Sequence, residues 1–397
     1  MKWLTKNSAA LAVLAVGIVT AGAAQADEAW QKAAGIGPYA PAQQDWAAIE
    51  KAARAEGKVV IYSVSSRIAK LAKGFKEKFG VELEGYDIPS DLQLEKFRRE
   101  HKAGVNSVDV LFNAEAPLLL NETLPNKLAW TFVPDSVAGD LDENEKAPLL
   151  VQRHSSRVVY YNTALNPDGP PIDSLWDLTR EEWKGRTLLP SPLEDGLSAN
   201  FFQTILHHAD DMAAAYKKEF GKEIVYSKAV LKAVKKNKTI EAPTASMEWL
   251  YRFLANEPVF QGSTSKIFKN VGDVKQKKAP LGITTFSKMR SNKKGVYAAA
   301  PIYNLEPAFG VSYPTALLIA DMAPHPNAAK LLVRYMMEKG FKPWNEPGDY
   351  AARASVEAKQ VEKFKLPSFG EMKLWAIDPD DIYNTKYGFL ALYLALS

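Results

Sequence analysis

The chain has 397 residues, of which 50 are lysine or arginine and 46 are aspartate or glutamate, so its formal net charge at pH 7 is +4. Such a small excess gives no electrostatic case for binding nucleic acid. The chain contains no cysteine, which excludes disulfides, thiolate metal sites, a cysteine nucleophile and a lipid-bearing cysteine anchor.

The first residues have the pattern of a secretory signal peptide. Two lysines precede an uncharged apolar stretch over 8–23, and Ala24-Gln25-Ala26 offers a cleavage site before the first acidic residue, Asp27. We therefore expect residues 1–26 to be removed on export, which leaves 371 of the 397 residues. Export without disulfides or an anchor favours a soluble protein of the periplasm, with an extracellular destination as the alternative.

Strands and helices then alternate along the chain. The expected elements are strand 59–62, helix 67–79, strand 81–88, helix 90–103 and strand 108–112. Ser90 and Gln93 fit a capping box at the start of the second helix. Strands separated by helices predict an α/β fold, a mostly parallel sheet with helices on both faces. Because 371 residues exceed the size at which one core stops growing, we expect two lobes.

Polar side chains follow the first and third strands. Ser63, Ser65, Ser66 and Arg67 come after the first, and Asn113–Glu115 after the third. In such sheets ligands bind beyond the carboxyl ends of the strands. The serine turn has two interpretations. The serines can simply cap the following helix, or the helix N-terminus, the hydroxyls and Arg67 together can bind an anion.

The second half of the chain repeats this arrangement. A strand at Arg157–Asn162 and a short strand at 187–191 lead into the loop Ser191–Ser198, which opens a helix containing Asn200. The polar turn thus occurs twice, once in each expected lobe. This repetition favours a ligand contact for at least one of the two turns.

Further elements complete the predicted fold. We expect strands at 279–286 and 311–320, and a helix at 327–338 closed by Gly340 as its C-cap. The apolar tail 388–397 is too short to span a membrane. We expect the tail to pack as a last helix or strand.

Four stretches occur in the order seen in periplasmic solute-binding proteins of ABC importers. They are Lys58-Val-Val-Ile-Tyr-Ser63, Ser107-Val-Asp-Val-Leu-Phe112, Arg157-Val-Val-Tyr-Tyr-Asn-Thr163 and Trp183-Lys-Gly-Arg-Thr-Leu-Leu-Pro190. Over 58–340 the sequence resembles this family, and most closely its ferric-iron-binding branch. The resemblance implies a two-lobed type 2 periplasmic-binding-protein fold whose lobes are joined by crossing strands. The ligand would be enclosed in the cleft between the lobes by hinge closure.

The resemblance also implies partners and lobe boundaries. We expect a small-molecule ligand, a permease in the inner membrane and a monomeric state, and no nucleic acid. With crossings near 157–162 and 303–311, lobe 1 would begin with 27–157 and lobe 2 would comprise 158–303. Residues 304–397 would return to lobe 1 and add the C-terminal helices.

The iron ligands that the resemblance implies are missing. Iron binders of this family typically use a histidine at the first turn, a glutamate after the third strand and a later tyrosine pair. Those positions hold Ser66, Ala114, Thr285 and Phe286. Glu115 is one residue late, so a shifted iron site is the alternative. We expect no metal site and no cofactor, and instead a small organic anion bearing a phosphate, phosphonate or carboxylate.

The candidate ligand-binding residues are mainly hydroxyl, amide and charged side chains of the polar turns. They are Ser63, Ser65, Ser66, Arg67, Asn113, Glu115, Ser191, Asp195, Gly196, Ser198, Asn200, Thr285, Phe286 and Arg290. Phe286, Tyr86 and Trp249 could form apolar walls, although each fits an ordinary core equally well.

Catalytic signatures are weak in this sequence. His207 and Asp211 lie four residues apart on an expected helix, a spacing that can share a metal, but no third ligand is near. Gly196-Leu-Ser198-Ala-Asn200 lacks the second glycine of a nucleophile elbow. His154 and His325 are the candidate bases for an exported hydrolase, which is the alternative from a different class. We expect a binding protein and no enzyme.

Overall fold

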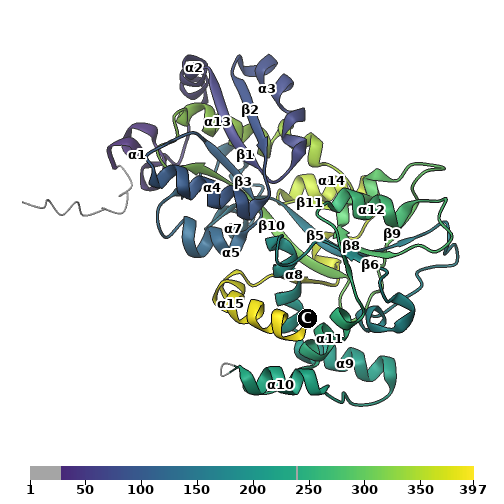
Figure 1. The fold of residues 1–397 in the computed structure, drawn as a ribbon. Coiled ribbons are helices and arrows are strands. Elements are labelled where there is room, and N and C mark those ends of the chain that lie inside the picture. Colours follow the sequence, from purple (N-terminus) through teal and green to yellow (C-terminus); the bar gives the residue numbers. More distant parts are fainter. Residues whose placement is uncertain (1–27, 238–239) are drawn as a thin grey trace, which may run out of the picture.

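The structure is a computed structural model that describes residues 28–237 and 240–397. The predicted signal peptide, 1–26, therefore lies outside the described residues. The described chain forms two α/β lobes that share one twelve-stranded sheet (Figure 1). Across these residues, no helix is both long enough and apolar enough to cross a membrane.

The sheet runs through both lobes in the order β2-β1-β3-β10-β5-β8-β6-β7, with β4 and β12 paired to β10, and β9 and β11 paired to β5. Its strands are β1 Lys58–Ser63, β2 Glu82–Asp87, β3 Val110–Asn113, β4 Ala129–Trp130, β5 Leu150–Asn162, β6 Thr187–Leu189, β7 Val259–Phe260, β8 Leu281–Thr285, β9 Ala299–Pro301, β10 Gly310–Ala320, β11 Asp349–Ala351 and β12 Leu374–Ala376.

Lobe 1 is built on β1, which pairs in parallel with β2 on one side and β3 on the other. Ile61 and Tyr62 of β1, which point to opposite faces, are both buried, as expected for a strand covered on both faces. The helices of this lobe are α1 Glu28–Ala34, α2 Trp46–Glu56, α3 Ala72–Phe79, α4 Ser90–Lys102, α5 Ala116–Leu118, α6 Asp135–Ala138, α7 Glu143–Lys146 and α13 Pro326–Met337. The predicted order of strands and helices over 59–112 is confirmed.

Lobe 2 is built on β8, which pairs in parallel with β6, and β6 pairs in parallel with β7. Trp176, Trp249 and Phe202 are fully buried in its core. Its helices are α8 Gly196–His207, α9 Ala209–Phe220, α10 Lys228–Lys236, α11 Ala245–Ala255 and α12 Thr264–Gly272.

The chain crosses between the lobes in β5 and β10, which form an antiparallel ladder. One end of β5 pairs with the part of β10 that adjoins β3, and its other end pairs with β8. The ladder is interrupted once, because its register shifts between Thr315 and Ala316. The expected crossing at 157–162 falls in the second half of β5, and the expected crossing at 303–311 ends where β10 begins. The lobe boundaries at 157/158 and 303/304 stay a prediction.

Helix α15, Pro379–Leu396, is the last element, so the apolar tail forms a helix. It packs against α8, α10 and α11 of lobe 2 and also contacts α5 of lobe 1 (Figure 1). Helix α14, Ala354–Phe364, precedes it on the far side of the sheet region and follows β11 directly.

Two predicted helix caps are wrong. Ser90 is the first helical residue of α4, and its Oγ accepts from the Ala114 backbone N–H at 3.1 Å. Gln93 donates to the Ile88 carbonyl at 2.9 Å. Both side chains therefore tie α4 to neighbouring strand ends instead of closing a capping box. Gly340 lies inside a 3-10 helix, 339–344, that continues the chain beyond α13.

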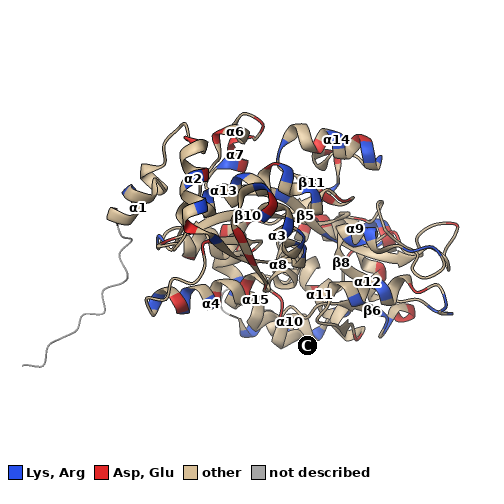
Figure 2. Cartoon of the chain, turned by 90° about the horizontal axis from the view of Figure 1, so that it is seen from above, with Lys and Arg blue, Asp and Glu red and all other residues tan. Residues whose placement is uncertain are grey.

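Acidic and basic side chains are interspersed over the helices (Figure 2). Residues of both signs occur along most helices in this view.

Candidate ligand-binding cleft

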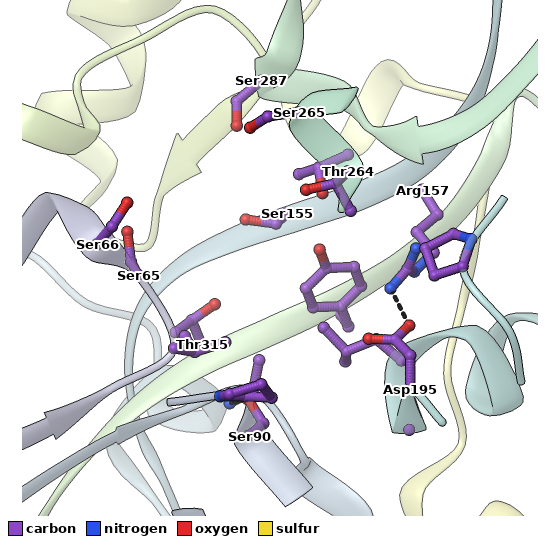
Figure 3. Close-up of a pocket in the computed structure, with 18 of the residues that line it drawn as sticks. Ser65, Ser66, Ser90, Ser155, Arg157, Asp195, Thr264, Ser265, Ser287 and Thr315 are labelled. Atoms are coloured by element: carbon purple, nitrogen blue, oxygen red, sulfur yellow. Dashed lines mark hydrogen bonds and ion pairs between the residues drawn. The ribbon is translucent and has the colours of Figure 1, made fainter. Parts of the chain in front are cut away.

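A cleft of about 570 Å³ lies between the lobes (Figure 3). The turns after β1 and β3 line it from lobe 1. The loop before α8, the start of α12 and the 3-10 helix 286–291 line it from lobe 2. The crossing strands β5 and β10, with β11, supply the rest of its wall. Hydroxyl side chains are abundant in the lining: Ser65, Ser66, Ser90, Ser155, Ser191, Ser263, Thr264, Ser265, Thr285, Ser287 and Thr315.

The structure brings together both predicted polar turns at this cleft. The candidate residues that line it are Ser65, Ser66, Arg67, Glu115, Ser191, Asp195, Gly196, Thr285 and Arg290. The remaining candidates, Ser63, Asn113, Ser198, Asn200 and Phe286, lie behind the wall and are buried.

Three of the candidates behind the wall hold its backbone in place. Ser63 Oγ accepts from the Ser65 backbone N–H at 3.1 Å, so it shapes the first turn. Asn113 Nδ2 donates to the Ser90 carbonyl at 2.8 Å, which joins β3 to α4. The backbone N–H of Ser198 donates to the Asp195 carboxylate at 2.8 Å, so that carboxylate caps α8.

Phe286 does not reach the cleft. It is fully buried and packs against the rings of Phe309 and Tyr303, because the 3-10 helix directs it into the core of lobe 2. Trp249 is likewise core, and Tyr86 is exposed on β2 without lining the cleft. Phe286 and Trp249 therefore follow the core alternative, and the prediction of Phe286 as a ligand-binding residue is wrong.

Capping does not explain the serine turn. No side chain caps the 3-10 helix 66–70. Ser65 Oγ instead accepts hydrogen bonds from Arg67 Nε and Trp344 Nε1, each at 3.2 Å. Ser66 lines the cleft. The turn thus presents its polar groups to the space between the lobes.

Asp349, which sequence reasoning missed, organises the cations at one end of the cleft. Its carboxylate accepts from Arg67 Nη1 at 2.7 Å, lies 3.5 Å from Arg153 Nε and accepts from Ser155 Oγ at 2.8 Å. Burial by itself would raise the pKa of Asp349, but Arg67 and Arg153 outweigh burial and lower that pKa to about 2. Asp349 is therefore ionised and compensates part of the charge of both guanidinium groups.

A glycine explains how β11 reaches this position. Gly348 has φ +85°, and a Cβ there would lie 2.7 Å from the Phe286 ring. The backbone before Asp349 therefore passes against the 3-10 helix 286–291 at a distance that only glycine permits.

Arg157 on β5 is the second residue that sequence reasoning missed. Its side chain is 3% exposed and pairs with the Asp195 carboxylate through Nη2 (Figure 3). Its Nε and Nη1 atoms are buried and have no hydrogen-bond partner. Buried guanidinium N–H groups are costly to leave without a hydrogen-bond partner. We therefore expect a ligand to supply an acceptor for these Arg157 donors.

Lys288 and Arg290 bring two more cations to the cleft from lobe 2. Lys288 Nζ donates to Ser265 Oγ at 2.9 Å, and Arg290 Nη1 donates to Ser287 Oγ at 3.1 Å. Neither forms an ion pair within the described part of the chain. Burial, followed by the neighbouring Arg290 and Arg67, lowers the pKa of Lys288 to about 8. Burial and Arg67 lower the pKa of Arg290 in the same way.

Glu115 connects the lobes at the other end of the cleft. It is 3% exposed, and its Oε2 accepts from Asn200 Nδ2 on α8 at 3.0 Å. Its Oε1 has no hydrogen-bond partner. A Cβ on Gly196 would lie 2.5 Å from that atom, so the lobes approach closely here. Burial raises the pKa of Glu115 to about 8, against the opposing hydrogen bond from Asn200 and with help from Asp195 and Asp91.

The donor set suits an anion better than a metal. Among the described residues that line the cleft, Tyr313 is the one tyrosine and no histidine is present. The described acidic cluster with metal-ligand spacing, Asp173, Asp177 and Glu219, lies away from the cleft. The carboxylates of Asp177 and Glu219 already pair with Arg180.

His207 and Asp211, whose spacing raised the possibility of a shared metal, do not pair with each other. His207 Nδ1 lies 3.0 Å from the Asp381 carboxylate on α15, and Asp211 pairs with His208 instead. A break between α8 and α9 at His208 removes the continuous helix on which that prediction relied.

Comparison with solved structures of known proteins identifies the fold. Iron-bound HitA from Pseudomonas aeruginosa is 18% identical with a TM-score of 0.61, over 86% of this chain and 99% of that one. The substrate-binding protein of an ABC transporter from Agrobacterium tumefaciens is 12% identical with a TM-score of 0.62, over 86% and 94% of the two chains. The chain has the two-lobed periplasmic-binding-protein fold. This confirms the predicted fold class.

A third protein with the periplasmic-binding-protein fold, the ferric binding protein from Campylobacter jejuni, is 16% identical with a TM-score of 0.58, over 85% of this chain and 99% of that one. No family model and no curated protein matches the chain. At these identities the likeness concerns the fold, and the ligand has to be argued from the cleft itself.

Proposed function

We propose that the protein is the substrate-binding component of an ABC importer, which captures a small organic anion in its cleft and delivers it to a membrane permease. The observation that carries this proposal is Arg157, whose buried Nε and Nη1 lack partners at the cleft wall. A phosphate, phosphonate or carboxylate would offer these donors a charged acceptor, and hydrogen bonds to a charged acceptor are stronger than neutral ones. Hinge closure around it would occur in the periplasm, with the protein as a monomer.

The surrounding groups support an anion in the same way. Lys288 and Arg290 line the cleft without an ion-pair partner among the described residues. Burial, followed by neighbouring cations, lowers the pKa of each, and a bound anion would oppose both effects. Serine and threonine hydroxyls of both lobes add neutral donors. A cleft of about 570 Å³ has room for a small organic molecule as well as its charged group.

Ferric iron is the second candidate, favoured by the iron-binding proteins among the similar structures. Ferric iron requires several free anionic oxygens. In this cleft Asp349 and Asp195 pair with arginines, and one oxygen of Glu115 accepts from Asn200. The other lining carboxylates, Asp87, Asp91 and Glu194, form no ion pair with a described residue, but no histidine and only one tyrosine accompany them in the described lining. An iron complex carried by an organic anion would still fit the cations.

Hydrolysis finds no support at the cleft. Ser198, the serine of the incomplete elbow motif, is 2% exposed, and no histidine is among the described lining residues. A base within hydrogen-bond reach is what a serine nucleophile requires. Binding without turnover is therefore the function we propose.

Native mass spectrometry of freshly purified protein tests this proposal. We expect a mass increment that corresponds to a small organic anion, and thermal stabilisation by members of a panel of carboxylates, phosphates and phosphonates. Retention of a bare ferric ion, or turnover of ester or phosphate substrates, would contradict the proposal.

Anion binding is also expected to draw a proton onto Lys288. In the free protein its pKa is about 8, and a bound anion raises that pKa because opposite charge favours the protonated amine. Above pH 8, binding should therefore be accompanied by proton uptake, and affinity should fall as the pH rises further. Calorimetry at pH 8.5 in buffers of different ionisation enthalpy measures this uptake.

Two variants isolate the group responsible for proton uptake. Lys288→Met should abolish the buffer dependence, whereas Lys266→Met, which removes an exposed lysine of α12, should leave it unchanged. Equal binding heats in all buffers for the unmodified protein would contradict the assignment to Lys288.

A further inference from the structure

Charge in the cleft is separated into two ends. At one end lie Arg67, Arg153, Lys288 and Arg290, together with Asp349. The carboxylate of Asp349 compensates Arg67 and Arg153 in part. Lys288 and Arg290 form no ion pair with a described residue, although Asp87 acts on Lys288 and Glu346 on Arg290 electrostatically. This end therefore retains positive charge after the internal ion pairs are counted.

The opposite end is acidic. Three carboxyl groups lie close enough there to shift one another's pKa: Asp91 of α4, Glu115 after β3 and Asp195 before α8. Asp195 is compensated by Arg157, but Asp91 forms no ion pair with any described residue. Glu115 is buried and its Oε1 has no partner, although it lines the cleft.

Figure 3 shows the two ends across the open space of the cleft. Ser287 and Ser265, the hydroxyl partners of Arg290 and Lys288, lie along one side. Ser90, next to Asp91 in sequence, lies on the opposite side, and Asp195 is on that side as well. A small molecule that fills the space can therefore contact both ends at once.

A simple anion would leave the acidic end unsatisfied. Burial, opposed by the Leu92 backbone N–H and assisted by Asp195, raises the pKa of Asp91, and burial raises that of Glu115. Unpaired carboxyl groups in a closing cleft disfavour closure unless a donor or a cation reaches them. A ligand amine would supply both, since an ammonium group has three N–H donors and a positive charge.

On the basis of the function proposed above, we propose that the ligand is a zwitterion that carries a phosphate, phosphonate or carboxylate at one end and an amine at the other. The anionic group lies among Lys288, Arg290 and Arg157, since Arg157 is close enough to Lys288 to act on it electrostatically. The amine lies against Asp91, beside Glu115. Asp91 is thus a specificity-determining residue, because it separates aminated anions from their unaminated analogues.

Matched pairs of small molecules test this inference by calorimetry. The pairs are alkyl carboxylates, alkylphosphonates and alkyl phosphates of two to five carbons, each with and without a terminal amine; 3-aminopropylphosphonate against propylphosphonate is one such pair. We expect the aminated member of the bound pair to bind about tenfold more tightly or better, a difference typical of one charged hydrogen bond.

Variants assign the two ends separately. Asp91→Asn should reduce the preference for the amine to about twofold or less, while Glu95→Gln, which removes a carboxylate from the same helix outside the cleft, should retain it. Lys288→Met should weaken both members of a pair by the same factor, because it acts on the shared anionic group.

The outcomes separate this inference from the function on which it rests. Equal binding of aminated and unaminated anions overturns the zwitterion and leaves the anion-binding function in place. A preference for the amine that survives Asp91→Asn overturns the assignment to that carboxylate and with it the proposal. If no member of the panel binds, the proposed function itself fails.

Discussion

Replacing Arg157 with methionine is expected to lower the affinity for the tightest-binding anion of the panel by about a hundredfold or more. The guanidinium group is 3% exposed, and two of its donors lack partners in the unliganded cleft. Loss of one partner of a buried charged hydrogen bond costs about 2–5 kcal/mol, and each 1.4 kcal/mol is about a factor of ten in affinity. Calorimetric titration of the purified variant gives the measurement.

The control variants for Arg157→Met address the Asp195 carboxylate, which this substitution leaves without its ion-pair partner. The double variant Arg157→Met, Asp195→Asn removes both charges and should bind as weakly as the single variant, with a melting temperature closer to that of the parent protein. Arg157→Lys keeps the charge without the planar fork and should recover only part of the affinity. Undiminished affinity in Arg157→Met would remove the main support for the proposed function.

Replacing Asp349 with asparagine is expected to destabilise the protein by about 3–5 kcal/mol at neutral pH, the usual cost of removing one partner from a buried ion pair. The carboxylate is fully buried as a side chain, 2.7 Å from Arg67 and 3.5 Å from Arg153. Without it, two buried cations face each other uncompensated. Denaturant unfolding of the variant and of Asp142→Asn, an exposed aspartate that caps nothing, measures the difference.

The pH dependence of that difference follows from the lowered pKa of Asp349. Since its pKa in the folded protein, about 2, lies below the ordinary value of 3.8, the carboxylate contributes stability above pH 3.8. This contribution is lost as the pH falls from 3.8 through about 2. The difference in free energy of unfolding between the parent protein and Asp349→Asn should therefore narrow over this range. A difference that stays constant with pH would show that the charge of Asp349 is not its cause.

Local patterns in the sequence sufficed for the fold. Apolar strands such as 59–62 and amphipathic helices such as 67–79 alternate clearly, and the polar turns after them mark the strand ends where the cleft lies. These features depend on residues close together in sequence, which is why composition and periodicity reveal them.

The residues that set the charge of the cleft were harder to find. Arg153, Ser155 and Arg157 occupy alternate positions of β5 and line the cleft, within a continuous polar run over 152–157 that apolar residues flank. That polar run inside a buried strand was present in the sequence and could have indicated a site on the crossing strand, one face of which takes every second residue. Asp349 had no such signal, because it meets Arg67 across 282 residues of chain.

The prediction of Phe286 as a ligand contact failed for a related reason. The family resemblance matches Phe286 to the position of a metal ligand in the iron binders. The direction in which a side chain points after a strand end, however, depends on the turn that follows. Here the chain enters a 3-10 helix directly after Thr285, which turns the ring into the core.

The register shift between Thr315 and Ala316 bears on how the cleft opens. It interrupts the β5–β10 ladder beside Arg153 and Thr315, where the chain passes from one lobe to the other. A ladder that is already broken at this point can flex without losing further hydrogen bonds. The crossing strands therefore oppose opening less than a continuous ladder would, and the contact between the lobes at Glu115 and Asn200 is what opening has to break. A ligand that fills the cleft adds its own contacts to that one, so it shifts the balance towards the closed form.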